Sequence, residues 1–520
     1  MFGNKIHRYL YIFFLSGIAF SLPVSVFMTS VFIIALVINR LLDTSSWHYL
    51  KRLPSDKPLL VFLLIYLLYV IFMLNTGNTD RGLMVLQLKL PLLAIPLVIA
   101  TSASLSMLEK RIILSSFILG VFLASVSGIV YYFIIADDMP DRRDISLFIS
   151  HIRLSLMVCF SFFISSYYTL IHDETDFRFK YVYVLFALWF LFFLLVLMSY
   201  TGIIIFLLVL FYSSYRIARR SGNRPYVRVN ITVTAVLLLA LTAYLGFRVK
   251  DYYTIMEDRR PDYSVRTAGN RPYFHDTGKD YLENGYYVWR YICESELRPA
   301  WNRRSTLDYD AVDLKNQEIK YTLIRYMTSL GLKKDSLGVS KLSERDIDMI
   351  ESGYANSRYK DGVSINDRVY ELIWQLDYYF KGGNPQGHSV TQRIEFFLTG
   401  LRVFKRYPLF GTGTGDLEDE FRKQYTADGS ALDSEHRFIS HNQYLTVLIT
   451  FGITGFIIFM YALLYPVIRM RGFRDYLFAV FFIIIMLSML NEDTMETHTG
   501  ITFFSLFYSL FIFGQGKKQG

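Results

Sequence analysis

The segment YVYVLFALWFLFFLLVLM occupies residues 181–198 and contains no charged side chain. An α-helix rises about 1.5 Å per residue, so as a helix this segment is about 27 Å long, close to the roughly 30 Å hydrocarbon core of a bilayer. In lipid, only a helix or a closed barrel satisfies every backbone polar group. The segment therefore predicts a membrane-spanning helix.

Similar apolar runs recur along the 520-residue chain, and we count about twelve candidate spans. The first two share the run 9–39, in which Ser21-Leu22-Pro23 offers a place for a hairpin. We predict an all-α polytopic membrane protein, with a large, mostly helical extracytoplasmic loop between spans nine and ten. The remaining runs are 59–74, 86–103, 112–135, 154–171, 181–198, 202–215, 231–247, 444–468, 476–490 and 501–513.

The composition agrees with a membrane protein. Charged residues make up 19% of the chain, below the roughly 25% of a typical soluble domain. The two cysteines exclude a disulfide scaffold and a multi-cysteine metal cluster. The net charge of +9 is by itself compatible with a nucleic acid, an anionic substrate or a membrane as partner.

The distribution of this charge separates those alternatives. Alternate short loops are basic, as at Lys110-Arg111 and 469–474, whereas the loops between them are acidic or mixed, as at 492–496. Basic loops resist translocation, so both termini are expected in the cytoplasm and no nucleic-acid partner is needed. The expected domains are spans one to nine at 1–249, an extracytoplasmic loop domain at 250–440, and the last three spans at 441–520.

Polar residues that could bind a substrate or take part in catalysis are densest at 387–455. Arg393 directly precedes a predicted amphipathic helix, along which Arg402 follows. Arg437 lies shortly before His441, at the mouth of a span. Arg393 and Arg437 are suited to hold a pyrophosphate beside a neutral imidazole, because a guanidinium stays charged and contacts phosphate oxygens in pairs. An interfacial histidine also serves as a plain polar anchor, so position alone leaves the role of His441 open.

The run Gly411-Thr412-Gly413-Thr414-Gly415 has several interpretations. A dinucleotide fingerprint needs a strand, a turn and a helix with a later acidic residue, and a Walker loop needs Gly-Lys-Ser/Thr; neither pattern surrounds this run. Two alternatives remain. The N–H groups around Gly411 and Gly413 either point, in a tight turn, toward an anion or a neighbouring helix, or serve ordinary loop geometry.

Further candidates lie at the outer ends of other spans. Arg153 either binds phosphate or snorkels to the interface. The loop 491–498 either recognises sugar hydroxyls, holds a divalent ion with His498, or is an ordinary acidic loop. His388 is expected to form loop hydrogen bonds and Cys159 to pack inside a span.

The order of these motifs resembles the O-antigen ligase and O-antigen polymerase family. The likeness rests on Arg393, Pro408-Leu-Phe-Gly-Thr-Gly413, His441-Asn-Gln-Tyr-Leu445 and Phe451-Gly-Ile-Thr-Gly455, which follow about nine or ten spans and a large outer loop. Residues 320–335 and 387–393 look like the version found in Bacteroidota-type members. The resemblance implies a GT-C-like fold in the inner (cytoplasmic) membrane, with the large loop in the periplasm.

The resemblance also implies an activity. A glycan would pass from undecaprenyl diphosphate to an acceptor hydroxyl, such as a sugar of the lipid A core, without a metal or cofactor. It implies that His441 is the general base and that Arg393 stabilises the diphosphate. The expected substrate-binding residues are Arg437, Arg153, Asn442, Arg402, Gly411 and Gly413.

One position departs from the family. An arginine of the family lies in a Ser-Arg-Thr-Gly-like motif, and the matching residues here are Ser199-Tyr200-Thr201-Gly202. Another cation, such as Arg153 or Arg248, would have to replace it.

Other functions remain open at this level. A repeat-unit polymerase and a protein O-oligosaccharyltransferase belong to the same family. A polysaccharide transporter or flippase would also explain twelve spans. It predicts inverted repeats and charged helices near the midplane of the bilayer, and neither is evident in the sequence.

Overall fold

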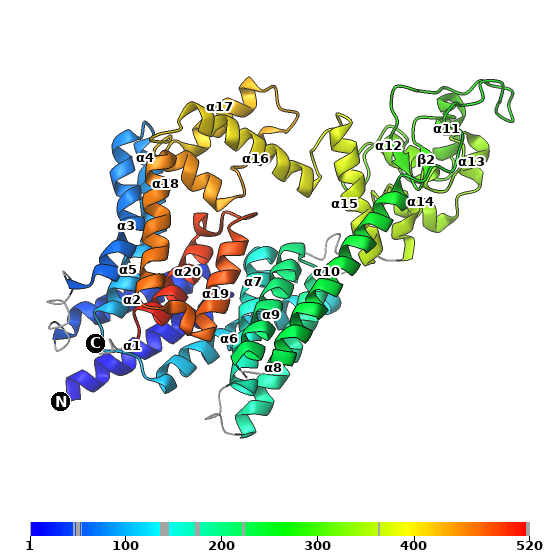
Figure 1. The fold of residues 1–520 in the computed structure, drawn as a ribbon. Helices are drawn as coiled ribbons and strands as arrows, with labels where there is room; N and C mark the ends of the chain where they lie inside the picture. Colours follow the sequence, from blue (N-terminus) through cyan, green and yellow to red (C-terminus); the bar gives the residue numbers. More distant parts are fainter. Residues whose placement is uncertain are drawn as a thin grey trace. The chain divides into compact units, whose positions relative to one another are not determined.

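The computed structural model describes the chain except residues 1, 45–46, 48–52, 54, 136–144, 172–176, 221–223, 362–363 and 516–520. Its residues form two compact units, Met1–Asn230 with Arg393–Gly520, and Ile231–Gln392. Figure 1 shows that the first unit is built mainly of helices and that the second contains both helices and long irregular segments.

The first unit contains the predicted spans except 231–247, which falls in the second unit. The predicted hairpin is present: α1 (Phe2–Ser21) ends at Ser21, and Ser25 caps α2 (Val26–Leu42) by accepting a hydrogen bond from the N–H of Met28. The other long or apolar helices of this unit are α3 (Lys57–Ile71), α4 (Thr79–Lys89), α5 (Pro91–Ala100), α6 (Met107–Val130), α7 (His151–Leu170), α8 (Phe177–Leu197), α9 (Tyr200–Arg220), α18 (Gln443–Arg469), α19 (Tyr476–Ser488) and α20 (His498–Ile512).

The membrane character is confirmed by these helices. Among the described residues, eight helical segments are long and apolar enough to cross a bilayer. They include α10 (Arg224–Tyr252), which runs from the first unit into the second. Three shorter apolar helices, α2, α19 and α20, accompany them. The protein is an all-α, multi-pass membrane protein.

An aromatic cluster fixes the helices on which the site is built. The ring of Phe160 on α7 lies 5.3 Å from that of Phe481 on α19 and 6.1 Å from that of Phe503 on α20. Phe117 on α6 lies 5.7 Å from Phe503. Edge and tilted contacts of this kind add to the burial of the rings. The helices α7, α19 and α20 are thereby held in one packed bundle, and α18 packs along α3 (Figure 1).

Outside the membrane-type helix α10, the second unit combines short helices with long irregular segments, since residues 253–293 and 302–318 form no helix. The predicted large loop is therefore only partly helical. A short antiparallel hairpin pairs β1 (Leu282–Glu283) with β2 (Tyr286–Tyr287). Trp301, Leu323 and Met327 are fully buried in its core. The helices are α11 (Glu294–Trp301), α12 (Ile319–Ser329), α13 (Ser336–Ser340), α14 (Glu344–Glu351) and α15 (Ile365–Phe380).

Two further helices precede α18 in the chain. The predicted amphipathic helix is α16 (Ser389–Arg406), and the acidic helix after the glycine run is α17 (Leu417–Ala427). Phe396, Val403, Phe421 and Leu445 pack together, which joins α16 and α17 to the start of α18. This packing brings Arg393 and His441 to the same part of the first unit.

Candidate active site

The start of α18 is tied to the loop between α19 and α20. Asn442 caps the helix: its side-chain oxygen accepts from the N–H of Leu445 at 2.9 Å, and its amide nitrogen donates to the carbonyl of Leu490 at 2.7 Å. The N–H of Gln443 donates to the carbonyl of Met489 at 3.0 Å. These bonds set the acidic loop at 491–496 beside residues 440–443.

His441 has an unusual backbone. Its φ of 48° lies in the left-handed region, which a residue with a side chain seldom adopts. Its ring centroid lies 5.3 Å from that of Phe396 and 6.1 Å from that of Phe438, and about a third of the side chain (30%) is exposed. The surroundings therefore hold a strained, partly exposed imidazole in one place.

Glu492 joins two of the predicted site residues. One carboxylate oxygen accepts from Nη2 of Arg393 at 2.7 Å, and the other lies 3.9 Å from Nδ1 of His441. In the described part of the chain, this Nδ1 has no hydrogen-bond partner. Glu492 is largely buried, whereas Arg393 is about one-third exposed. The carboxylate thus holds a cation and an imidazole on one side of the membrane domain.

Arg153 belongs to the same cluster. It lies in the first turn of α7, where the hydroxyl of Ser150 accepts a hydrogen bond from its N–H. It interacts electrostatically with Glu492 and Asp493. The cluster thus contains two arginines and two carboxylates around one histidine.

Asp493, the residue that follows Glu492 in the chain, is buried. The hydroxyl of Thr446 donates to one of its oxygens at 2.6 Å, and the other oxygen is without a hydrogen-bond partner among the described residues. Burial raises the pKa of Asp493 to about 6, against the opposing hydrogen bond from Thr446. The negative charge of Glu496 contributes to this raised pKa.

A buried ion pair also anchors the acidic loop at 491–496. The fully buried ammonium of Lys89 donates to Glu496 at 2.7 Å and to the carbonyl of Met495 at 2.6 Å. The amide of Gln443 donates to the second oxygen of Glu496 at 2.8 Å. Reasoning from the sequence missed Lys89. The available signal was a lone cation inside the apolar run 86–103, which in a membrane protein points to a functional or structural partner.

Two predicted arginines have other partners. Arg437 donates through Nε to the carbonyl of Leu432 at 2.9 Å, and its guanidinium lies 5.9 Å from the ring of Tyr425. Arg402 forms an ion pair with Asp428 at 2.8 Å, about 13 Å further along α16 than Arg393. Among the predicted residues, the structure joins Arg393, Arg153 and His441 through the acidic loop, and it links Arg437 and Arg402 to the segment 425–432.

The glycine run fits against a break in α18. The helix is interrupted at Gly452, whose φ is 64° and ψ is −173°. The freed carbonyls of Ile449 and Thr450 accept from the N–H groups of Thr412 at 2.9 Å and Gly413 at 3.0 Å.

The N–H of Gly411 also donates within the chain, to the carbonyl of Tyr407 at 3.1 Å. A Cβ on Gly413 would lie only 2.5 Å from the carbonyl oxygen of Asn75, so this close approach requires glycine. These amides are engaged inside the protein, which supports loop packing rather than anion binding for Gly411 and Gly413.

The segment 199–202, where the sequence departs from the family motif, also borders the acidic loop. Tyr200 is half exposed at the start of α9, and the hydroxyl of Thr201 accepts from Asn491 at 2.8 Å. Arg153 interacts with the same acidic loop and is thus the cation available near this motif. Arg248 belongs to the second unit, where it pairs with Asp251 at 3.3 Å.

The remaining candidates have separate environments. His388 of the second unit lies 5.2 Å from the ring of Trp374, and burial together with the charge of Arg325 lowers its pKa to about 4. The thiol of Cys159 is buried and donates to the carbonyl of Gly202 at 3.4 Å. Among the described residues, no group of three or more His, Cys, Asp and Glu side chains is placed to hold a metal ion.

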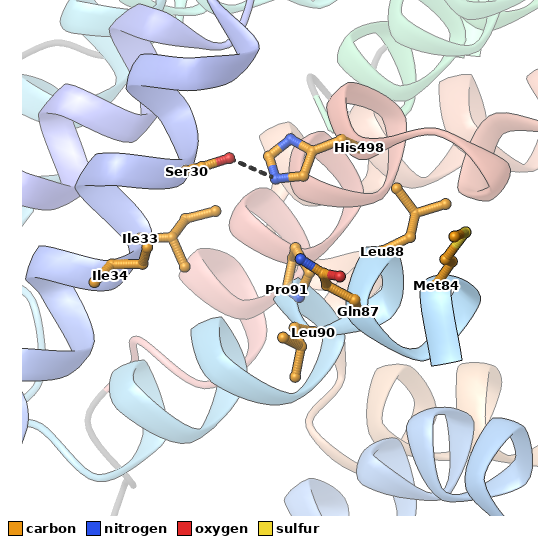
Figure 2. Close-up of a pocket in the computed structure, with 9 residues that line it drawn as sticks. All are labelled: Ser30, Ile33, Ile34, Met84, Gln87, Leu88, Leu90, Pro91 and His498. Atoms are coloured by element: carbon orange, nitrogen blue, oxygen red, sulfur yellow. Dashed lines mark hydrogen bonds between the residues drawn. The ribbon is translucent and has the colours of Figure 1, made fainter. Parts of the chain in front are cut away.

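His498 borders a cavity of about 350 Å³ instead of the acidic cluster. Its Nε2 lies 3.1 Å from the hydroxyl of Ser30, as Figure 2 shows. Most of the lining is aliphatic, including Ile33, Leu88 and Leu90. This environment offers one polar contact and an apolar wall.

The comparisons with known proteins identify one segment. A model of the family described as O-antigen ligase matches residues 350–460. The matched segment contains Arg393, the glycine run and His441. A search of curated proteins finds no match.

Proposed function

We propose, from the membership of residues 350–460 in the O-antigen ligase family, that this multi-pass membrane protein transfers a glycan from undecaprenyl diphosphate to an acceptor hydroxyl. The family is one of O-antigen ligase and polymerase-type glycosyltransferases that act in glycan assembly. The proposed acceptor is a sugar of the lipid A core. The proposed location is the inner membrane, with both termini in the cytoplasm and residues 250–440 in the periplasm.

The observation that carries this proposal is the shared contact of Arg393 and His441 with Glu492. The oxygen of the acceptor hydroxyl attacks the anomeric carbon, and its proton passes to the imidazole of His441. A glycosidic bond forms while the bond from the anomeric carbon to the diphosphate oxygen breaks. Undecaprenyl diphosphate leaves with the electron pair of that bond.

The charged side chains have distinct roles in this scheme. Because Nδ1 of His441 faces Glu492, Nε2 remains to accept the proton, and the carboxylate then stabilises the imidazolium. Arg393 and Arg153, which both interact with Glu492, supply the positive charge that stabilises the leaving diphosphate. Glu492 holds the guanidinium of Arg393 in position until the diphosphate competes for it. The scheme uses no metal and no cofactor.

Purified full-length protein in liposomes, given an undecaprenyl-diphosphate-linked oligosaccharide and a lipid A core acceptor, tests the proposal. His441→Ala should lower the rate of transfer by about 10²–10⁴-fold, the usual contribution of a general base. His436→Ala is the matched control, because this histidine lies in the neighbouring short helix Ser434–His436 and is expected to retain the wild-type rate.

The product distinguishes the members of the family. Glycan attached to the lipid A core indicates a ligase, a longer lipid-linked glycan a polymerase, and glycan on an added protein acceptor a protein O-oligosaccharyltransferase. Movement of intact lipid-linked glycan across the liposome membrane without transfer would indicate a flippase. A wild-type rate for His441→Ala would contradict the mechanism.

A further inference from the structure

A groove lies between α6 and α8, at the far end of α7 from the charged cluster. Arg111, at the mouth of this groove, has its guanidinium 5.5 Å from the ring of Tyr168. Arg153 and Tyr168 are separated by about 22 Å along α7, at about 1.5 Å per residue. Because α7 is a membrane-spanning helix, the two positions belong to opposite leaflets.

Arg111 is surrounded by aromatic rings. Its guanidinium also lies 5.4 Å from the ring of Phe179 and 5.6 Å from that of Tyr183, and its Nε donates to the hydroxyl of Tyr183 at 3.3 Å. Among the described residues, its partners are these three rings and one hydroxyl, and none is a carboxylate. The preceding Lys110 differs, because it interacts electrostatically with Asp475.

A guanidinium has five N–H donors, and only Nε has a hydrogen-bond partner within the described residues. Within the part of the chain that the structure describes, the four N–H groups on its two terminal nitrogens therefore remain for a ligand. The rings fix the plane of the guanidinium by cation–π contact without neutralising its charge. This arrangement suits a phosphate group, whose oxygens accept two parallel hydrogen bonds from arginine.

The groove beside Arg111 is apolar and has a volume of about 480 Å³. It follows α6 from Leu108 to Leu119, and Val182 and Phe186 of α8 form its other wall. From Arg111 to Leu119 it extends about 12 Å toward the middle of the bilayer. The small side chains of Ser115 and Ser116 leave room along its floor, and their hydroxyls are bonded to Tyr183 and to the carbonyl of Ile112.

We propose that this groove binds an anionic glycerophospholipid, with the phosphate on Arg111 and one acyl chain between α6 and α8. The cation lies in the second turn of α6, at the level where headgroups meet the hydrocarbon core, and the apolar groove continues inward from it. Charge and shape therefore select the same ligand. The site is separate from the proposed glycan-transfer centre and does not depend on that function.

Binding of lipid to the full-length protein in detergent tests this site. Delipidated protein is titrated with phosphatidylglycerol, with phosphatidylethanolamine of the same acyl chains, with diacylglycerol and with inorganic phosphate, and bound lipid is counted by native mass spectrometry. We expect one tightly bound phosphatidylglycerol, with an affinity about tenfold or more above that of phosphatidylethanolamine. Equal binding of the two phospholipids, or equal protection from thermal unfolding by inorganic phosphate alone, would overturn the proposal.

Two variants test the two ends of the groove separately. Arg111→Gln removes the charge, and Ser116→Leu fills the apolar channel while Arg111 remains. Each should abolish the preference for phosphatidylglycerol. Arg219→Gln, an exposed arginine in the last turn of α9, is the matched control and should keep that preference. Retention of the preference in both groove variants would exclude this site, and the lipid comparison on the wild-type protein decides the question even if one variant fails to fold.

Discussion

The glycine run at residues 411–415 and the segment at residues 440–443 both border α18, but the amides of the run and the imidazole of His441 are used in opposite ways. In the glycine run, amides such as those of Thr412 and Gly413 donate to carbonyls that the break in α18 sets free. In the other segment, His441 is strained and partly exposed, and in the described part of the chain its Nδ1 is without a hydrogen-bond partner. Satisfied groups stabilise a fold, whereas a strained and partly exposed imidazole whose Nδ1 faces a carboxylate leaves its Nε2 for a substrate. This difference supports a structural role for the glycines and agrees with our proposal that His441 is the general base.

The largest effect on stability is expected when the buried ion pair between Lys89 and Glu496 is broken. Lys89→Met leaves the carboxylate of Glu496 largely buried without its cation, which should lower the free energy of unfolding by about 3–5 kcal/mol. Thermal unfolding in detergent measures this loss. The double variant Lys89→Met with Glu496→Gln removes both charges and should recover most of the stability. A single variant as stable as the wild type would show that the pair does not anchor this loop.

Arg393→Gln should act on the reaction instead. Removing a cation that stabilises the leaving diphosphate should reduce transfer by about 10²–10³-fold. Because largely buried Glu492 loses its direct ion pair, some stability should also be lost, so thermal unfolding is measured and activity is compared for the folded fraction. The control is Arg402→Gln on the same helix, whose partner is Asp428. If both variants lost activity equally, charge along α16 in general would matter, and the specific contact of Arg393 with Glu492 would not.

Gly452→Ala should lower the stability of the protein without changing the rate of transfer by the folded molecules. This position has a φ of 64°, and an added Cβ would lie 2.2 Å from the carbonyl oxygen of Leu409. We expect a loss of about 1–3 kcal/mol in stability, with normal specific activity in the folded fraction. Gly382→Ala is the matched control, because Gly382 has a φ of 83° but a Cβ added there would meet no described atom within 4 Å. Equal losses at both sites would mean that the backbone angle, and not the contact with Leu409, limits residue 452.

The smallest effect concerns pH. Because burial raises the pKa of Asp493 to about 6, its folded form retains a proton that the unfolded chain releases near pH 4. The stability that protonated Asp493 contributes is full below about pH 4 and is lost as the pH rises through about 6. Asp493→Asn, which keeps an acceptor for Thr446, should therefore gain melting temperature relative to the wild type between these values. A difference in melting temperature that stays constant over this range would contradict the burial of an ionisable carboxyl here.

The sequence was informative where the physical signal is local. Apolar runs long enough for a bilayer predicted the helices, and Ser21-Leu22-Pro23 predicted the first hairpin. The spacing of Phe396, Phe397, Leu401 and Phe404 predicted the amphipathic helix that carries Arg393. The family resemblance likewise rests on short motifs and was confirmed at residues 350–460.

The partners of these residues were beyond reach of the sequence. Arg437 is close to His441 in the chain, yet its guanidinium contacts Leu432 and Tyr425. Arg153, far from both in sequence, interacts with Glu492 and Asp493. Proximity along a chain says little about side chains that leave a turn in different directions.

The sequence by itself determined that this is a multi-pass helical membrane protein with its candidate base just before a late span, because hydropathy and helical periodicity are properties of neighbouring residues. Only the tertiary structure placed Glu492 between Arg393 and His441 and paired Lys89 with Glu496. It also brought the amides of the glycine run within hydrogen-bond distance of the carbonyls at the break in α18. Each of these contacts links residues distant in the chain. Their formation depends on how the helices pack, since a buried charge or amide takes the partner that packing brings within hydrogen-bond distance.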